Sequence, residues 1–221
     1  MYVMPSHLPR EVAVSLTYRG LMAYRAVTVA KDLVKSSHNY KTAIVIGSHG
    51  LGLWTVQTAY SLIAESDKMR WVIADTSAQA EEYVQAAYHN NFSTFDLLNW
   101  PPNCYEQDLI EKTRRACSEK VDLVFDYSGQ ARVAKRMTGL LNDDCVVVTV
   151  GDPKVWPIPS SGRAVSCGYV NEGDLRRLPE LVQLLSKGDL RAPRLVPLSK
   201  LSLSEEDEDQ LNNTEGSDAV F

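Results

Sequence analysis

The residues best placed to do chemistry are glycines that follow a short apolar run. Residues 44–46 precede the segment Gly47-Ser48-His49-Gly50-Leu51-Gly52, after which a helical pattern begins. A glycine turn between a strand and a helix exposes backbone N–H groups, and these bind phosphate together with the helix dipole. Gly47 and Gly52 occupy the first and third glycine positions of a dinucleotide-binding turn, and His49 occupies the second. The pattern predicts a phosphate-binding turn, with His49 either directed away from the phosphates or beside them as a further donor.

One carboxylate follows in chain order. Asp75 ends the second predicted strand, residues 71–74, about 20 residues beyond the last glycine of the turn. A carboxylate in this place accepts hydrogen bonds from ribose hydroxyls and repels a 2′-phosphate, so the pattern favours NAD over NADP as the cofactor. The alternative interpretation of Asp75 is a surface turn, because Asp is common in turns at strand ends.

These residues need a scaffold, and the hydropathy pattern predicts one. Short apolar runs alternate with segments of helical spacing about five times, which is typical of an α/β fold with a doubly wound parallel sheet (Rossmann-type) and helices on both faces. The expected strands cover residues 42–46, 71–74, 94–98, 121–127, 145–150 and 164–170. The expected helices cover two segments within 8–33, broken near Arg19-Gly20, and residues 50–64, 77–88, 106–118, 130–141 and 175–185.

The composition narrows the class of protein. The 221 residues include 23 Lys and Arg against 28 Asp and Glu, a net charge of −5 that argues against a nucleic-acid binder. The four cysteines form no C-x-x-C pair, which argues against a structural zinc site, and Cys145 and Cys167 lie in apolar runs where we expect them to be buried. We see no signal peptide and no apolar run long enough for a membrane span, so we expect a cytoplasmic protein with no membrane partner.

Several segments together resemble the cofactor-binding part of the medium-chain dehydrogenase/reductase superfamily. No single segment is decisive, but their order and spacing are similar over most of residues 5–190. The segments are 8–16, Gly20-Leu21-Met22-Ala23-Tyr24-Arg25-Ala26, 45–57, Val121-Asp122-Leu123-Val124-Phe125-Asp126 and 146–151, with Ala219-Val220-Phe221 resembling the closing strand.

The resemblance implies a site and also departures from the family. It implies that the nicotinamide half of the cofactor lies near the ends of the fourth and fifth strands, at Tyr127, Ser128, Gly129, Val150 and Gly151. The resemblance leads us to expect that the family's N-terminal barrel domain, which carries most of the substrate pocket, is missing from this chain. Where zinc-dependent members have a cysteine, this chain has Tyr18, so we expect no metal site and a closer likeness to the zinc-free quinone or enone reductases. We identify no catalytic residue; a proton-donor role for Tyr18 or Tyr24 is weaker than core packing.

The chain divides into three expected parts. Residues 1–40 form a helical lead-in, 41–190 the dinucleotide-binding domain, and 191–221 a C-terminal segment with an acidic stretch at 204–209. Without the barrel domain, we expect apolar surface around Leu16 and Tyr24 to be exposed, where a second copy or a protein partner could bind. The histidines at 7, 38 and 89 are isolated and expected at the surface.

Four interpretations of function stay open. The first is an NAD(P)(H)-dependent oxidoreductase that transfers hydride to a quinone, enone or carbonyl. The second is an inactive dehydrogenase-like module that acts as a nucleotide sensor or protein-interaction partner. The third is a methyltransferase, which also uses a glycine turn after its first strand and an acid after its second. The fourth is a shortened product of a longer enzyme.

Overall fold

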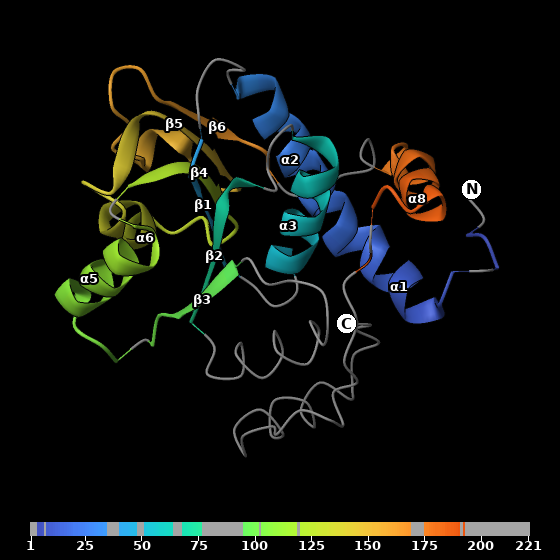
Figure 1. Ribbon diagram of the computed structural model, residues 1–221, viewed down its shortest axis with the longest axis horizontal. Coiled ribbons are helices and arrows are strands. Elements are labelled where there is room, and N and C mark those ends of the chain that lie inside the picture. The colour runs from blue at the N-terminus through green and yellow to red at the C-terminus, as the bar shows by residue number, and fades with distance from the viewer. Residues whose placement is uncertain are drawn as a thin grey trace.

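The fold is built on one six-stranded sheet. The computed structural model describes residues 4–6, 8–34, 40–47, 51–63, 68–76, 95–101, 103–118, 120–168, 175–190 and 192. Every strand pairs parallel to its neighbours, in the order β3-β2-β1-β4-β5-β6. The predicted doubly wound α/β fold is therefore confirmed (Figure 1). The strands are β1 (Thr42–Ile46), β2 (Arg70–Asp75), β3 (Phe95–Asn99), β4 (Val121–Asp126), β5 (Leu141–Thr149) and β6 (Arg163–Ser166).

Apolar residues on both sides of each central strand explain this sheet. All residues of β1 and β4 are buried, as expected for strands covered by helices on both faces. Alternate residues enter different cores, because side chains of a strand point alternately to opposite faces. In β1, Val45 packs into the core that includes Phe125, whereas Ile44 packs into the core that includes Val124. The sheet thus has two hydrophobic cores, one on each face.

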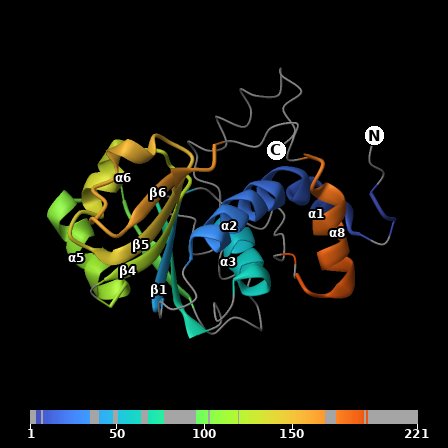
Figure 2. The ribbon, with the colours of Figure 1, turned by 90° about the horizontal axis from the view of Figure 1, so that it is seen from above.

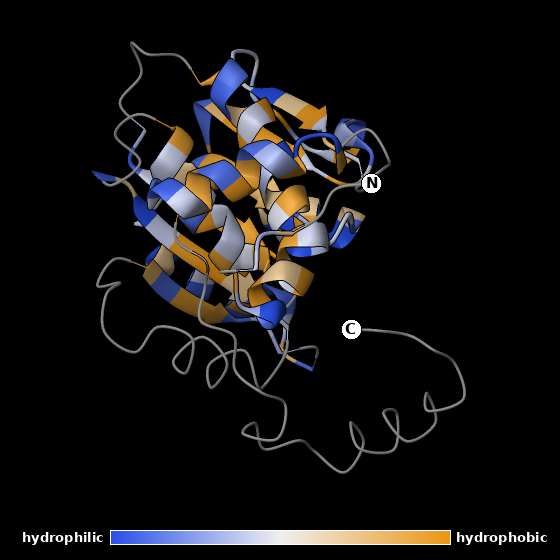
Figure 3. Ribbon diagram, turned by 90° about the vertical axis from the view of Figure 1, so that its right-hand side faces the viewer, coloured by the Kyte–Doolittle hydropathy of each residue, from blue (hydrophilic) through white to orange (hydrophobic). Residues whose placement is uncertain are grey.

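The helices form two layers, one on each face of the sheet. Figure 2 shows α2 and α3 on one side, α5 and α6 on the other, and α1 and α8 beyond the α2 and α3 layer. The apolar residues of these helices are interleaved with polar ones, as the hydropathy colours in Figure 3 show. The helices are α1 (Arg10–Ser15), η1 (Leu16–Gly20), α2 (Leu21–Leu33), α3 (Leu51–Leu62), α5 (Glu106–Ala116), α6 (Ala131–Arg136), η3 (Pro153–Val155) and α8 (Leu178–Lys187). None of the described helices is long and apolar enough to span a membrane.

The first helix is continuous, and the predicted break near Arg19-Gly20 is wrong. Residues Leu16–Gly20 form a π-helical turn that joins α1 directly to α2. Gly20 is buried there against the Leu16 side chain and Leu181 of α8, so its role is close packing rather than a break. Ser15, at the end of α1, accepts a hydrogen bond from Trp54 Nε1 in α3 at 2.7 Å, which holds the two helices together.

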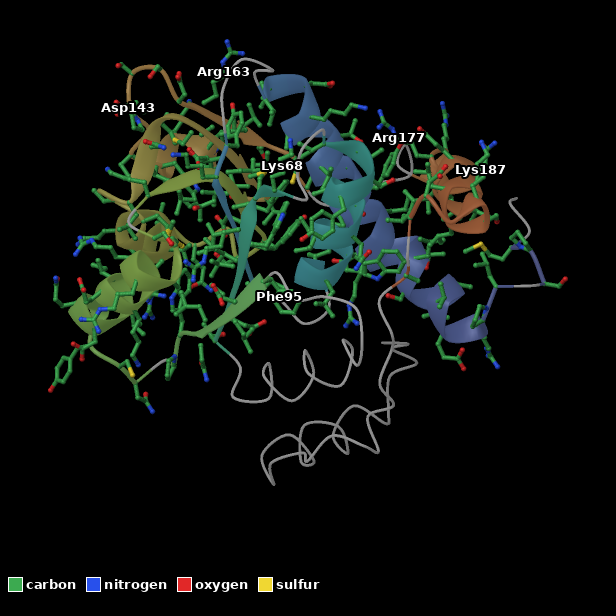
Figure 4. The ribbon with its side chains drawn as sticks, viewed as in Figure 1. Lys68, Phe95, Asp143, Arg163, Arg177 and Lys187 are labelled. Carbon is green, nitrogen blue, oxygen red and sulfur yellow. The ribbon has the colours of Figure 1, made fainter. Side chains whose placement is uncertain are left out.

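The expected exposed patch around Leu16 and Tyr24 is also wrong. Leu16 is fully buried and Tyr24 is 4% exposed, and both belong to a core that also contains Leu181 of α8. Arg177, which Figure 4 shows beside α8, stands over the Tyr24 ring at 6.0 Å. The exposed apolar residues of the first helix are instead Val14 and Tyr18, so core packing, which we expected for both tyrosines, holds for Tyr24 and is wrong for Tyr18.

Several boundaries differ from the expected ones. The helix after β4 ends at Arg136 rather than 141, and β5 begins at Leu141 rather than 145. The early part of β5 is polar, and its pairing with β4 shifts in register between Val121 and Leu123. Cys145 and Cys167 are buried as predicted. The expected helix at 77–88, the four histidines, the acidic stretch and the closing strand lie outside the described residues.

Candidate dinucleotide site

The carboxyl ends of β1 and β4 mark the place where the sheet reverses its order. From β1 the chain proceeds outward to β2 and β3, and it then returns to β4 on the other side of β1. In open α/β sheets of this order, ligands bind outside the carboxyl ends of the strands at such a switch point. The predicted site residues end β2, follow β1, β4 and β5 in the sequence, or lie in the first turn of α3.

Gly47 begins the turn after β1 in a conformation that only glycine adopts readily. Its φ is +97°, and its N–H donates to the Ala74 carbonyl at 3.1 Å. A Cβ added here would lie 3.1 Å from the backbone nitrogen of Ser128. Gly47 therefore lies close against the backbone that follows β4, and even a methyl group at this position would crowd that backbone.

The third glycine position brings a helix close to the sheet. Gly52 lies in the first turn of α3, and a Cβ there would lie 3.0 Å from Cγ2 of Ile73 in β2. Leu51, beside it, is buried. This close approach is the packing that the third glycine of a dinucleotide turn allows. Ser48, His49 and Gly50 lie outside the described residues, so the orientation of the His49 side chain stays a prediction.

Asp75 is the last residue of β2 and is not an exposed turn residue. It is 7% exposed, and its carbonyl accepts a hydrogen bond from the Trp100 N–H at 2.7 Å. Its register partner is Asn99, the last residue of β3. Asp75 therefore stands at the carboxyl edge of the sheet, one strand away from the Gly47 turn.

A second tight turn follows β4, and its organising residue was missed by the sequence analysis. The carboxylate of Asp126 is buried, and its Oδ1 accepts hydrogen bonds from the N–H of Ser128 at 2.9 Å, the Ser128 hydroxyl and the N–H of Gly129 at 3.2 Å. Gly129 has a φ of +61°. The signal for Asp126 was its place directly after an apolar strand and two residues before the predicted Ser128.

A third turn, after β5, touches the second. Val150 is buried and donates its N–H to the Asp126 carbonyl at 3.0 Å. A Cβ on Gly151 would lie 2.9 Å from both Cα and the carbonyl oxygen of Gly129, so the two backbones are in contact. The N–H of Gly151 is held by the Thr149 hydroxyl at 3.0 Å, another residue that the sequence analysis missed.

Tyr127 belongs to the core rather than to the surface of the site. Its side chain is buried, and its hydroxyl lies 2.7 Å from Oγ1 of Thr55 in α3. Because Thr55 donates its own hydrogen to the Leu51 carbonyl at 2.8 Å, Tyr127 is the donor in this pair. Burial raises the pKa of the Tyr127 phenol well above its usual value. Tyr127 thus ties the end of β4 to the first turns of α3.

The described part of the chain contains no cluster of three or more His, Cys, Asp or Glu side chains that could hold a metal ion.

Burial and the adjacent Glu180 carboxylate raise the pKa of Tyr24 to about 12, which makes this phenol a poor proton donor near neutral pH. Tyr18 is 56% exposed and therefore accessible.

Comparison with known proteins finds similar solved structures. No family model matches the sequence, and no curated protein matches it. Among solved structures, the chain is similar to the D-arabinose dehydrogenase from Sulfolobus solfataricus (TM-score 0.58, 16% identity, 84% of this chain and 55% of that one). It is also similar to the alcohol dehydrogenase from Aeropyrum pernix (TM-score 0.58, 21% identity, 85% and 52%). A third is an alcohol dehydrogenase from E. coli in complex with NADH (TM-score 0.56, 17% identity, 86% and 52%).

The shared fold is that of alcohol dehydrogenase-like proteins. At these identities the likeness is one of fold, and the chain spans about half the length of the structures that it matches.

Proposed function

We propose that this chain binds a dinucleotide, NAD(H) in preference to NADP(H), across the carboxyl ends of β2, β1, β4 and β5. The observation that carries the proposal is the convergence of three glycine turns at the switch point of the sheet. Gly47 lies against the Ser128 backbone, and Gly129 lies against Gly151. Side chains are excluded at each contact, which leaves backbone surface available for a pyrophosphate and a nicotinamide ring.

The preference for NAD rests on Asp75. Its buried position at the carboxyl edge of β2 is where a carboxylate accepts hydrogen bonds from the adenosine ribose. A 2′-phosphate at the same place would bring a dianion against a poorly solvated carboxylate.

The reaction that we propose is hydride transfer to a quinone, an enone or a carbonyl, without zinc. The cofactor supplies the hydride, and the residues of this chain bind and orient it. Tyr18 stands where zinc-dependent relatives in the medium-chain dehydrogenase/reductase superfamily have a cysteine, which favours the zinc-free branch. None of the four cysteines, all within the described residues, forms a disulfide, and this supports the proposal of a reducing compartment such as the cytoplasm.

A second candidate is a dehydrogenase-like module that binds nucleotide without hydride transfer and contacts another copy or a protein partner. His49 at the second glycine position and the exposed pair Val14 and Tyr18 favour it. Dinucleotide binding with no turnover of any quinone, enone or aldehyde would support this candidate over the first.

The test is a calorimetric titration of the purified chain with NADH and, separately, with NADPH. We expect saturable binding with NADH preferred, and we expect Asp75→Ala to weaken NADH binding by about tenfold and to narrow the gap to NADPH, since hydrogen bonds to a charged group are lost. The matched control is Asp143→Ala, an exposed residue near the start of β5 that Figure 4 shows at the periphery. No binding of either cofactor, or equal affinities in parent and Asp75→Ala, would contradict the assignment.

The role of His49 is decided by the same titration. If His49 obstructs the phosphates, His49→Gly tightens NADH binding. If it donates a hydrogen bond to them, the substitution weakens binding.

A further inference from the structure

The structure points to Asp126 as a positioning residue for the nicotinamide half of the dinucleotide, an inference that rests on the proposed function. Asp126 is the last residue of β4 and is 1% exposed. Its register partners are Ile46, just before the Gly47 turn, and Thr149, just before the turn after β5. Its carboxylate therefore stands at the centre of the three glycine turns.

Both carboxylate oxygens are engaged, each toward a different turn. Oδ1 accepts the hydrogen bonds of Ser128 and Gly129 described above, which fixes the turn after β4. Oδ2 accepts a hydrogen bond from the Thr149 hydroxyl at 2.9 Å, and that hydroxyl accepts the N–H of Gly151 at 3.0 Å. A continuous chain of hydrogen bonds thus runs from Ser128 through Asp126 and Thr149 to Gly151.

These hydrogen bonds hold the backbone segments that form two close contacts. Gly129 and Gly151 touch without room for a Cβ, and the Ser128 nitrogen lies against Gly47. A shift of the Ser128–Gly129 backbone therefore changes the surface on which the nicotinamide half would lie. The adenosine half, beside Asp75 at β2, is on the other side of β1 and is not linked to Asp126 by any of these bonds.

If Asp126 had a purely structural role, its substitution would affect cofactor binding no differently from that of another buried carboxylate. Asp122 provides the matched control. Asp122 lies on the same strand and is 2% exposed. It accepts the N–H groups of Lys41 and Thr42 at 2.8 and 2.9 Å and Nδ2 of Asn142 at 2.7 Å. It differs from Asp126 chiefly in its place near the amino end of the strand. If buried carboxylates of β4 only stabilise the fold, Asp126→Asn and Asp122→Asn behave alike.

The experiment compares the affinities of the full chain for NADH and for AMP, which carries only the adenosine half of the dinucleotide. In Asp126→Asn, Oδ1 still accepts from the turn, but an amide replaces the carboxylate oxygen that faces the Thr149 hydroxyl. We expect NADH affinity to fall by about tenfold or more, because hydrogen bonds to a carboxylate are replaced, while AMP affinity changes by less than about twofold. We expect Asp122→Asn to lower thermal stability and to leave the ratio of the two affinities unchanged.

A second pair of variants keeps the inference testable if Asp126→Asn does not fold. Thr149→Val removes the hydroxyl between Asp126 and Gly151 at nearly constant volume, and we expect it to lower the ratio of NADH to AMP affinity. Thr149→Ser keeps the hydroxyl, and we expect the parental ratio. If the parent binds NADH but the ratio is unchanged in Asp126→Asn and Thr149→Val, the positioning role is wrong and the proposed function stands. If the parent binds neither ligand, both are wrong.

Discussion

A comparison of Gly47 with Gly139 distinguishes two free-energy costs of replacing a glycine. One is the strain of a positive φ, and the other is the crowding of neighbouring atoms by the new side chain. Both have positive φ, +97° and +82°. A Cβ at Gly47 would lie 3.1 Å from Ser128 N and 3.3 Å from the carbonyl carbon of Tyr127, whereas nothing lies within 4 Å of a Cβ at Gly139. Substitution by Ala therefore strains the backbone at both positions but crowds a neighbour only at Gly47.

The magnitudes follow from these contacts. A left-handed conformation costs an L-residue about 1–2 kcal/mol, which is the whole cost that we expect for Gly139→Ala. Crowding against backbone that cannot rotate away adds about 1–3 kcal/mol at Gly47. For a chain of this size, about 2–4 °C of melting temperature per kcal/mol makes Gly47→Ala about 2–12 °C less stable than Gly139→Ala.

The assay is thermal unfolding of both variants at one pH and one protein concentration. Both variants are then titrated with NADH at a temperature about 20 °C lower than the lower of the two melting temperatures. We expect Gly139→Ala to keep the parental affinity for NADH and Gly47→Ala to lose it. Of these two glycines, only Gly47 touches the turn after β4. Equal melting temperatures would show that the Ser128 backbone moves aside, and the close approach would then carry no argument about the site.

Two further predictions concern groups away from the site. Arg136 is buried and forms an ion pair with Glu106, which is partly exposed, and the Arg136 guanidinium is the main cause that lowers the pKa of Glu106. Because a carboxyl whose pKa is lowered by folding contributes its full stabilisation above its unfolded pKa and loses it as the pH falls through its folded pKa, Glu106→Gln should lower the melting temperature at pH 7 by roughly 2–8 °C, for about 1–2 kcal/mol after screening. This difference in melting temperature should narrow as the pH falls below about 4, and a difference of undiminished size at pH 3 would exclude the ion pair as its source. Burial raises the pKa of Cys117 to about 12 and that of Cys145 to about 11, so iodoacetamide at pH 8 should label the half-buried Cys104 first. Peptide mass spectrometry checks this order, and equally fast labelling of Cys117 in the folded chain would contradict it.

The sheet was predictable because its signal is local. The run at 43–46 is apolar at every position, which is typical of a strand that helices cover on both faces. Gly47 and Gly52 were predictable for the same reason, since their place between a strand and a helix already restricts what they do. The close approaches of these two glycines to Ser128 and Ile73 could be stated only with the partners in place.

What could not be predicted depends on partners far apart in the chain. The start of β5 reads as a polar turn, Asn142-Asp143-Asp144, and becomes a strand because Leu141 pairs with Val121 and Asn142 reaches Asp122. Leu16 is buried in a core that also contains Leu181 of α8, whereas Tyr18 on the same helix is exposed. The local pattern of the first helix contains neither piece of information.

The π turn at Leu16–Gly20 also decides where the first helix tolerates a change in length. A π turn closes hydrogen bonds five residues apart instead of four, so it holds one residue more than an α turn over about the same rotation. Deleting one residue there would leave a regular α-helix that still presents Ser15 to Trp54. The same deletion within α1 or α2, where no extra residue is present, would turn everything before it by about 100° around the helix axis and exchange the inner and outer faces. A one-residue gap in this helix is therefore compatible with the packing inside the π turn and with neither α-helical part beside it.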